Sequence, residues 1–319
     1  MQRIAYIVVP NFGVIVFGGL AVFELTNKIV KNPHYEIHLI SEKGGLVRSS
    51  LGYSVMTDSF AQTADAGFDT VIIGGVLDGV YTATPALLEF LRSAVKTTRR
   101  VASMCTGAFY LAKAGVLEGR RVTTHWAHAR KLQEAHPGVR VEEDRIFIVD
   151  GPIWTSAGMT AGIDLAVSMV ERDLGVETAR TVAKRMVMFH RRAGGQLQHS
   201  TLLDIGTKTD RIQTALVFAR SNLKAPLTVE RLAEVANLSV RQFRRAFREE
   251  TGQSPAKAIE NLRLEQARLM VEQGRLSLEV IARETGFADV DRMRRAFVRT
   301  FGASPQAIRR NARITSQSG

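Results

Sequence analysis

The sequence predicts an α/β domain with a flavodoxin-like, largely parallel sheet, followed by an all-α domain with two helix-turn-helix units. Strand-like apolar runs alternate with helical segments through the first 190 residues or so, which indicates a parallel sheet covered on both faces. A basic sequence motif near the end of the chain occurs twice, as QFRRAFREETGQSP at 242–255 and as RMRRAFVRTFGASP at 292–305. Seven of the fourteen positions match. This duplication predicts two copies of one helical unit.

The bulk composition is that of an ordinary globular protein. The chain has 319 residues, of which 45% are hydrophobic and 23% charged, and this length predicts two or three domains. No apolar run reaches the roughly 20 residues of a membrane helix. The apolar start lacks the charged region and cleavage site of a signal peptide, and one cysteine excludes an internal disulfide. We expect a cytoplasmic protein with no membrane partner, metal or cofactor.

Positive charge is concentrated in the last third of the chain. The net charge is +12, and from Arg211 onward 20 Lys/Arg stand against 11 Asp/Glu, which gives +9 for that part. A basic domain attached to a nearly neutral one indicates a polyanionic partner for the tail alone.

The expected elements of the first domain alternate in type along the chain. The expected strands are 3–9, 35–41, 69–75 and 99–105, and the expected helices between and after them are 19–30, 85–95 and 106–115. We expect a ligand-sensing and dimerisation domain at 1–193, a glycine-containing linker at 194–209 and a DNA-binding domain at 210–319.

Cys105 follows the strand VASM directly and precedes a helix that begins at Thr106. Such an elbow is similar in principle to the nucleophile elbow of hydrolases, and helix amides there are expected to lower the pKa of the thiol. His125, at another strand end, is a candidate base, and Gly75 a candidate oxyanion donor. The alternative is structural: a small buried cysteine, a hydrogen-bonded core histidine and ordinary packing by Trp126. Spacing leaves both readings open.

The first duplicated unit, at about 227–252, has the signals of two capped helices. Thr228 is placed to cap the first helix, and Ser239 with Gln242 forms a capping box for the second. Gly252 is placed to end that second helix. Its expected buried residues are Phe243, Ala246 and Phe247, and its expected outward residues are Arg241, Arg244, Arg245 and Arg248. A helix, a tight turn and an arginine-studded second helix is the helix-turn-helix layout.

The second unit, at about 276–302, repeats the layout with Asp289 as the expected cap. The residues expected to point inward are Met293, Ala296, Phe297 and Phe301, and those expected outward are Val290, Asp291, Arg294 and Arg295. A connecting helix of about 18 residues spans roughly 27 Å. Successive major grooves on one face of DNA lie about 34 Å apart. The spacing therefore predicts that each copy reads its own groove segment.

This tail resembles the DNA-binding domain of AraC/XylS-type regulators over about 100 residues, 211–309. The matching motifs are Ile281-Ala282, Gly286-Phe287, Asp289, Arg295-x-Phe297, Phe301-Gly302-x-Ser304-Pro305 and, in the connecting helix, Arg263-Leu264-x-x-Ala267-Arg268-x-Met270. The chain departs from the family pattern at Arg292, where an aromatic residue is usual, and at Met293, where phenylalanine is usual. These departures leave the base preference of the second unit unreadable.

The resemblance implies which side chains meet DNA. The base contacts would come from Arg241, Arg244 and Arg245 in the first unit and from Val290, Asp291, Arg294 and Arg295 in the second. A bidentate arginine–guanine contact gives roughly 1–3 kcal/mol of discrimination. Asp291 would accept from a cytosine amino group or favour the helix N-terminus, and both readings stay open. Arg248 and Arg299 lie further along their helices and would hold phosphates. The plain alternative is that these arginines form a solvated face.

The first 200 residues resemble the class I glutamine amidotransferase-like domain of PfpI-type proteins, and most of all the GlxA-type branch, in which that domain precedes an AraC-type tail. The resemblance rests on DTVIIGG, SMCTGAFYLAKAGVLEGRRVTTHW and WTSAGMTAGIDLAVSMV. Enzymes of this superfamily pair the elbow cysteine, here Cys105, with a histidine, here His125, and with an early carboxylate. The segment after the first strand has no carboxylate before Glu24. That departure favours a domain that binds a ligand over one that hydrolyses it.

The resemblance also implies a small nitrogen-containing metabolite as effector. Gly75, Cys105, His125 and Trp126 are the candidate pocket residues, and Trp126 is suited to hold a cationic group through cation–π attraction. We expect a nucleoid-associated, metabolite-responsive activator with three further partners: double-stranded promoter DNA, RNA polymerase and a second copy of the chain. Two other functions compete with this one: a Cys-dependent amidase or glyoxalase-like enzyme with a DNA anchor, and an architectural protein whose first domain only dimerises.

Overall fold

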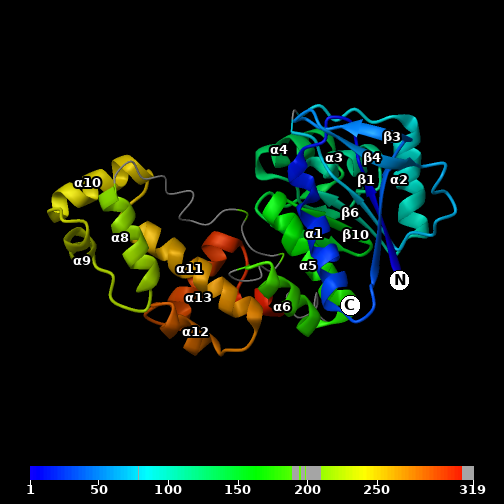
Figure 1. Ribbon diagram of the computed structural model, residues 1–319. Helices are drawn as coiled ribbons and strands as arrows, with labels where there is room; N and C mark the ends of the chain where they lie inside the picture. Colours follow the sequence, from blue (N-terminus) through cyan, green and yellow to red (C-terminus); the bar gives the residue numbers. More distant parts are fainter. Residues whose placement is uncertain (78, 189–193, 195–197, 199–209, 311–319) are drawn as a thin grey trace. The chain divides into compact units, whose positions relative to one another are not determined.

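The computed structural model describes residues 1–77, 79–188, 194, 198 and 210–310. The chain separates into two compact units, Met1–Gln198 and His199–Gly319 (Figure 1). The linker expected at 194–209 lies almost entirely outside the described residues. Within the described part of the chain, no helix is long and apolar enough to cross a membrane.

The first unit is built on an eight-stranded, mostly parallel sheet with the strand order β3-β4-β2-β1-β5-β6-β10-β9. The strands are β1 (Gln2–Ile7), β2 (Tyr35–Ser41), β3 (Lys43–Arg48), β4 (Ser54–Ser59), β5 (Thr70–Ile73), β6 (Arg100–Met104), β9 (Phe147–Asp150) and β10 (Ile153–Ser156). Only the two edge strands run antiparallel, β3 to β4 and β9 to β10. The predicted α/β class is confirmed, and the antiparallel edges are an addition.

Helices cover the two faces of this sheet because the chain changes direction at β1. From β1 it moves outward to β2, and from β5 it moves the other way to β6, so right-handed crossovers place the first two long helices on opposite faces. Figure 1 shows α1 and α5 side by side, and the two helices pack together. The helices of this unit are α1 (Gly18–Ile29), α2 (Pro85–Thr97), α3 (Ala108–Lys113), α4 (Trp126–Ala135), α5 (Met159–Leu174) and α6 (Val176–Arg185), with single turns η1 (Val14–Phe17) and η2 (Cys105–Gly107) and a small pair of strands, β7 (Arg121–Val122) and β8 (Arg140–Val141).

The described part of the second unit is helical and has two separate hydrophobic cores. Its helices are α8 (Asp210–Ser221), α9 (Val229–Val235), α10 (Val240–Thr251), α11 (Pro255–Gln273), α12 (Leu278–Glu284) and α13 (Val290–Phe301). Helix α11 contributes Ile259 and Leu262 to the first core, and Leu264, Ala267 and Val271 to the second. Helix α11 therefore connects the two helix-turn-helix units, and its first half packs into one hydrophobic core while its second half packs into the other.

The caps expected in the duplicated units are confirmed. Thr228 caps α9, and Ser239 with Gln242 forms the complete capping box of α10. Asp289 caps α13 by accepting from the amide of Arg292 at 2.6 Å. Gly252 ends α10 in the left-handed conformation, with φ of 70°. Local side-chain rules thus decide where these helices begin and end.

Candidate functional site

Helix α10 presents a row of arginines opposite two buried phenylalanines. Phe243 and Phe247 are 0% and 1% exposed, and they fix the inward face of the helix. On the other face lie four exposed arginines, Arg241, Arg244, Arg245 and Arg248. Arg245 forms an exposed ion pair of 3.8 Å with Glu249, one turn further on, and such pairs are weak in water. The face is therefore basic and accessible.

Helix α13 has a similar inward face, made of Met293, Ala296 and Phe297. Asp291, Arg294 and Arg295 are exposed, and Arg294 lies 3.3 Å from the carboxylate of Asp291. Val290 differs from expectation: it is only partly exposed and packs against the second core, so it does not simply point outward. Val290 stands three and seven residues before the buried Met293 and Phe297, so the helical period places it on the inward side of the helix.

Arg299, the expected phosphate contact on this helix, forms an ion pair within the protein. Its guanidinium forms an ion pair of 2.8 Å with Glu260 on α11. Glu260 pairs with Lys257 as well, at 3.1 Å, and although burial opposes it, hydrogen bonds from both cations lower the pKa of this carboxyl group. A phosphate at Arg299 would therefore have to compete with Glu260.

Cys105 lies at the sharp turn expected from the sequence. Its φ of 55° is in the left-handed region that non-glycine residues rarely adopt, and its side chain is buried. The expected lowering of its pKa is wrong. Burial raises the pKa of the Cys105 thiol, and the opposing hydrogen bonds from the backbone and side chain of Thr106 are too weak to reverse this effect.

Gly75 lies directly against the elbow. A Cβ atom added at Gly75 would stand 2.0 Å from Oγ1 of Thr106 and 2.8 Å from the amide nitrogen of Gly107. The Thr106 hydroxyl donates to the carbonyl of Val76 at 2.8 Å, which ties the elbow to the same loop. Gly75 is therefore packed against Thr106, where only glycine fits.

His125 lies beside the elbow at the start of α4. Thr124 donates from Oγ1 to the carbonyl of Cys105 at 2.8 Å, so the strand end carrying His125 is bonded to the elbow. His125 caps α4, with Nδ1 accepting from the amide of Ala127 at 3.3 Å. Trp126 is 53% exposed, its ring centroid 5.7 Å from that of His125. The imidazole is thus engaged as a cap, and the indole faces solvent.

Two residues near the candidate pocket residues were not predicted from the sequence: Tyr6, close to Cys105, and His128, close to His125. Tyr6, on β1, donates to the carbonyl of Val16, and burial together with the nearby Cys105 raises the pKa of its phenol. His128 lies one turn along α4 from His125, with ring centroids 5.9 Å apart, and its Nδ1 is 3.3 Å from Oη of Tyr81. The one sequence signal for Tyr6 is its place near the carboxyl end of a predicted strand, because ligand sites of parallel sheets lie at such ends.

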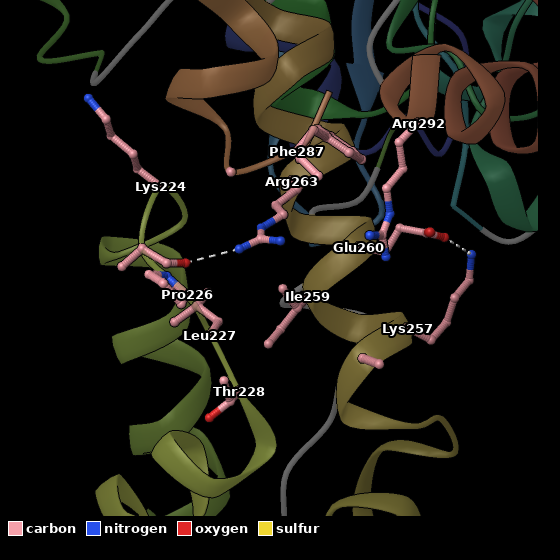
Figure 2. A pocket seen from close by; sticks show the side chains of 14 residues that line it. Lys224, Pro226, Leu227, Thr228, Lys257, Ile259, Glu260, Arg263, Phe287 and Arg292 are labelled. Carbon is pink, nitrogen blue, oxygen red and sulfur yellow. Dashed lines mark hydrogen bonds and ion pairs between the residues drawn. The ribbon is translucent and has the colours of Figure 1, made fainter. Parts of the chain in front are cut away.

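Two pockets are described, and neither is lined by the four candidate pocket residues. A pocket of ≈ 230 Å³ lies among Arg99, Arg100, Trp154 and their neighbours in the first unit. The larger one, of ≈ 610 Å³, lies between the two helix-turn-helix units (Figure 2). Among the described residues no cluster of metal-ligating side chains occurs.

A parallel α/β unit with an elbow cysteine, joined to paired helix-turn-helix units with basic outer helices, defines a DNA-binding regulator with an enzyme-like first domain. Comparison with known proteins agrees. Residues 15–172 match the model of the DJ-1/PfpI family, and residues 232–311 match that of a helix-turn-helix domain. The chain belongs to the DJ-1/PfpI family through its first domain and is an AraC-family transcriptional regulator through its second.

Three similar proteins illustrate the match. The HTH-type transcriptional regulator GlxA of Rhizobium meliloti is 29% identical, over 98% of this chain and 97% of its own length. The isonitrile hydratase of Pseudomonas putida is 31% identical, over 54% of this chain and 75% of its own. The crystal structure of Drosophila melanogaster DJ-1beta has a TM-score of 0.52 and 23% identity, over 59% of this chain and 99% of that one. This chain is therefore similar to a transcriptional regulator over nearly its whole length and to an enzyme over about half of it.

Proposed function

We propose that the chain is a metabolite-responsive, sequence-specific regulator whose helices α10 and α13 enter two successive major grooves. The observation that carries this proposal is the pair of capped helices with exposed arginines opposite a buried aromatic face, joined by the 19 residues of α11. A helix of that length spans roughly 28 Å, which is close to one turn of DNA. Base contacts are assigned to Arg241, Arg244, Arg245, Asp291, Arg294 and Arg295, with Val290 at the edge of the same helix, and phosphate contacts to Arg248 and Arg299.

The first domain, in this proposal, binds a small nitrogen-containing effector and performs no catalysis. Two observations support binding over catalysis. The Cys105 thiol has a raised pKa, which leaves little thiolate at neutral pH. The segment after β1, where superfamily enzymes carry a carboxylate, is the apolar turn η1, and Glu24 is exposed on α1. Cys105, His125 and Trp126 remain the proposed contacts, with Gly75 as backbone support.

Effector binding acts on DNA affinity through a second copy of the chain. Symmetric dimers suit the paired half-sites of regulator operators. A ligand shifts the balance between two arrangements only by its differential affinity for them, typically 1–3 kcal/mol. The proposed outcome is activation through contact with RNA polymerase at a promoter.

The test is DNA affinity measured with and without an effector. The purified protein is titrated calorimetrically with carnitine, betaine and arginine, and its affinity for a duplex selected from a random pool is measured with each. The proposal expects heat with one of them and a roughly 5- to 150-fold change in affinity. No heat with any of the three, or heat without a change in DNA affinity, would contradict it.

A Cys-dependent enzyme is the second candidate function. It is favoured by Cys105, which keeps the strained conformation of a nucleophile elbow, and by the similarity of the first domain to an isonitrile hydratase. Turnover of an isonitrile or an amide that disappears in Cys105→Ala would establish this alternative.

A further inference from the structure

The two helix-turn-helix units enclose a pocket with an excess of positive charge, which we call the central pocket. Its lining includes four basic side chains and one acidic one: Lys224, Lys257, Arg263, Arg292 and Glu260. The volume is ≈ 610 Å³, and the walls come from the turn before α9, the first half of α11, the turn before α13 and Arg292 in the first turn of α13 (Figure 2). Its basic lining is complementary to a polyanion.

Two of the four basic side chains hold the walls together. Arg263 donates to the carbonyls of Leu223 and Ala225 at 3.2 and 3.0 Å, and the second bond is drawn in Figure 2. Lys224 forms an ion pair of 3.0 Å with Glu284 on α12. Both cations therefore link separate segments of the pocket wall.

Arg292 is the cation available to a ligand, and Lys257 is paired only within its own helix. Arg292 is exposed and has no ion pair within the described residues, and it extends from α13 toward α11 in Figure 2. It lies close enough to Arg263 to lower the pKa of that guanidinium further, in addition to the effect of burial. Lys257 is held only by Glu260, at 3.1 Å, and is 45% exposed.

Arg292 also makes the pocket continuous with the DNA-reading face of α13. It lies three residues before Arg295, and residues at this spacing share one side of a helix. When helices α10 and α13 enter successive major grooves, a sugar–phosphate strand passes between the two helices. A basic hollow at that position meets phosphates, whose binding is not base-specific.

We propose that the central pocket binds the DNA backbone between the two major-groove sites, with Arg292 as its phosphate contact and Glu260 as an acid that holds Lys257 and Arg299 back from further ones. This inference rests on the proposed function. Glu260 pairs with Lys257 and with Arg299, so it occupies two cations that would otherwise attract phosphate, and its own charge repels phosphate. Glu260 thereby lowers the affinity for DNA of any sequence.

The test measures how DNA affinity depends on salt. Binding is followed from about 50 to 200 mM salt on two duplexes, one selected by the unaltered protein from a random pool and one of scrambled sequence. Each phosphate contact contributes about 0.9 to the slope of log K against log salt. We expect Arg292→Ala to weaken binding to both duplexes alike and to reduce the slope by about 0.9. Arg292→Lys keeps the charge and should restore the slope.

Glu260→Gln should act in the opposite direction. We expect tighter binding to both duplexes and a slope steeper by about one to two contacts, because Lys257 and Arg299 are released. The matched control is Glu234→Gln on α9, which removes an acid paired with Arg231 at 2.9 Å and outside the pocket lining. The control should leave the slope unchanged. Thermal unfolding of each variant verifies that the domain is folded.

Two results would overturn the inference. One is an unchanged slope in both Arg292→Ala and Glu260→Gln, and the other is a loss in Arg292→Ala confined to the selected duplex, which would indicate a base contact. Failure of the proposed function is distinguishable, because the unaltered protein would then bind the selected and scrambled duplexes equally. The slopes on the scrambled duplex would still test the pocket.

Discussion

Arg263, in the middle of α11, donates a hydrogen bond of 3.0 Å to the backbone carbonyl of Ala225, in the turn that follows α8. The same guanidinium bonds the carbonyl of Leu223 at 3.2 Å. Because α11 carries residues of both hydrophobic cores, this arginine fixes the turn to the helix that spaces the two reading units. The turn and the spacer helix therefore behave as one rigid part.

Replacing Arg263 by alanine should loosen this part. Two backbone carbonyls lose their donor, one of them part-buried (Leu223) and one exposed (Ala225). At about 0.5–1.5 kcal/mol for each hydrogen bond, the loss costs about 1–3 kcal/mol of the free energy of unfolding of the second domain. Urea unfolding, followed by a probe in that domain, measures the change. The control is Arg275→Ala, because Arg275 is exposed in the turn after α11 and its loss should cost under about 0.5 kcal/mol. Equal stabilities for the two variants would show that the hydrogen bonds contribute nothing.

Gly286→Ala should be the more damaging of two glycine substitutions. Gly286 has φ of +75°, and an added Cβ would lie 2.0 Å from the carbonyl oxygen of Leu223. Gly252 has φ of +70°, with nothing within 4 Å of its added Cβ. Gly252→Ala should therefore cost only the left-handed strain, roughly 1–2 kcal/mol, and Gly286→Ala distinctly more. Thermal unfolding compares them, and similar losses would mean that the backbone contact relaxes without cost.

The Cys105 thiol should react slowly at neutral pH. Its raised pKa keeps it protonated in the folded protein, so labelling by iodoacetamide should rise only at alkaline pH, above the range in which the urea-unfolded chain reacts. The stability contributed by the buried neutral thiol is fully present below the unfolded pKa and is lost as the pH rises through the folded pKa. A labelling rate already at its plateau at pH 7 would revive the thiolate nucleophile.

The predictable features were those decided within a few residues of sequence. The caps at Thr228, Ser239 and Asp289 follow from side chains that bond amides three residues away. The elbow at Cys105 follows from a strand that meets a helix without an intervening loop. These contacts are local, so the sequence pattern contains their geometry.

The features that escaped prediction depend on packing between distant segments. The ion pair of Arg299 with Glu260 joins residues 39 positions apart, and the proximity of Tyr6 to Cys105 joins β1 to the end of β6. The direction of the Cys105 pKa shift depends on whether burial outweighs hydrogen bonds from Thr106. No spacing rule ranks those two effects.

The central claim is that α10 and α13 read adjacent major grooves, and hydroxyl-radical footprinting on the selected duplex tests it most directly. We expect two protected patches about 10 base pairs apart on one face of the DNA. Arg244→Ala should relax base preference in one patch and Arg295→Ala in the other, each costing roughly 1–3 kcal/mol on the selected duplex. A single short patch, or the same protection on a scrambled duplex, would contradict the claim.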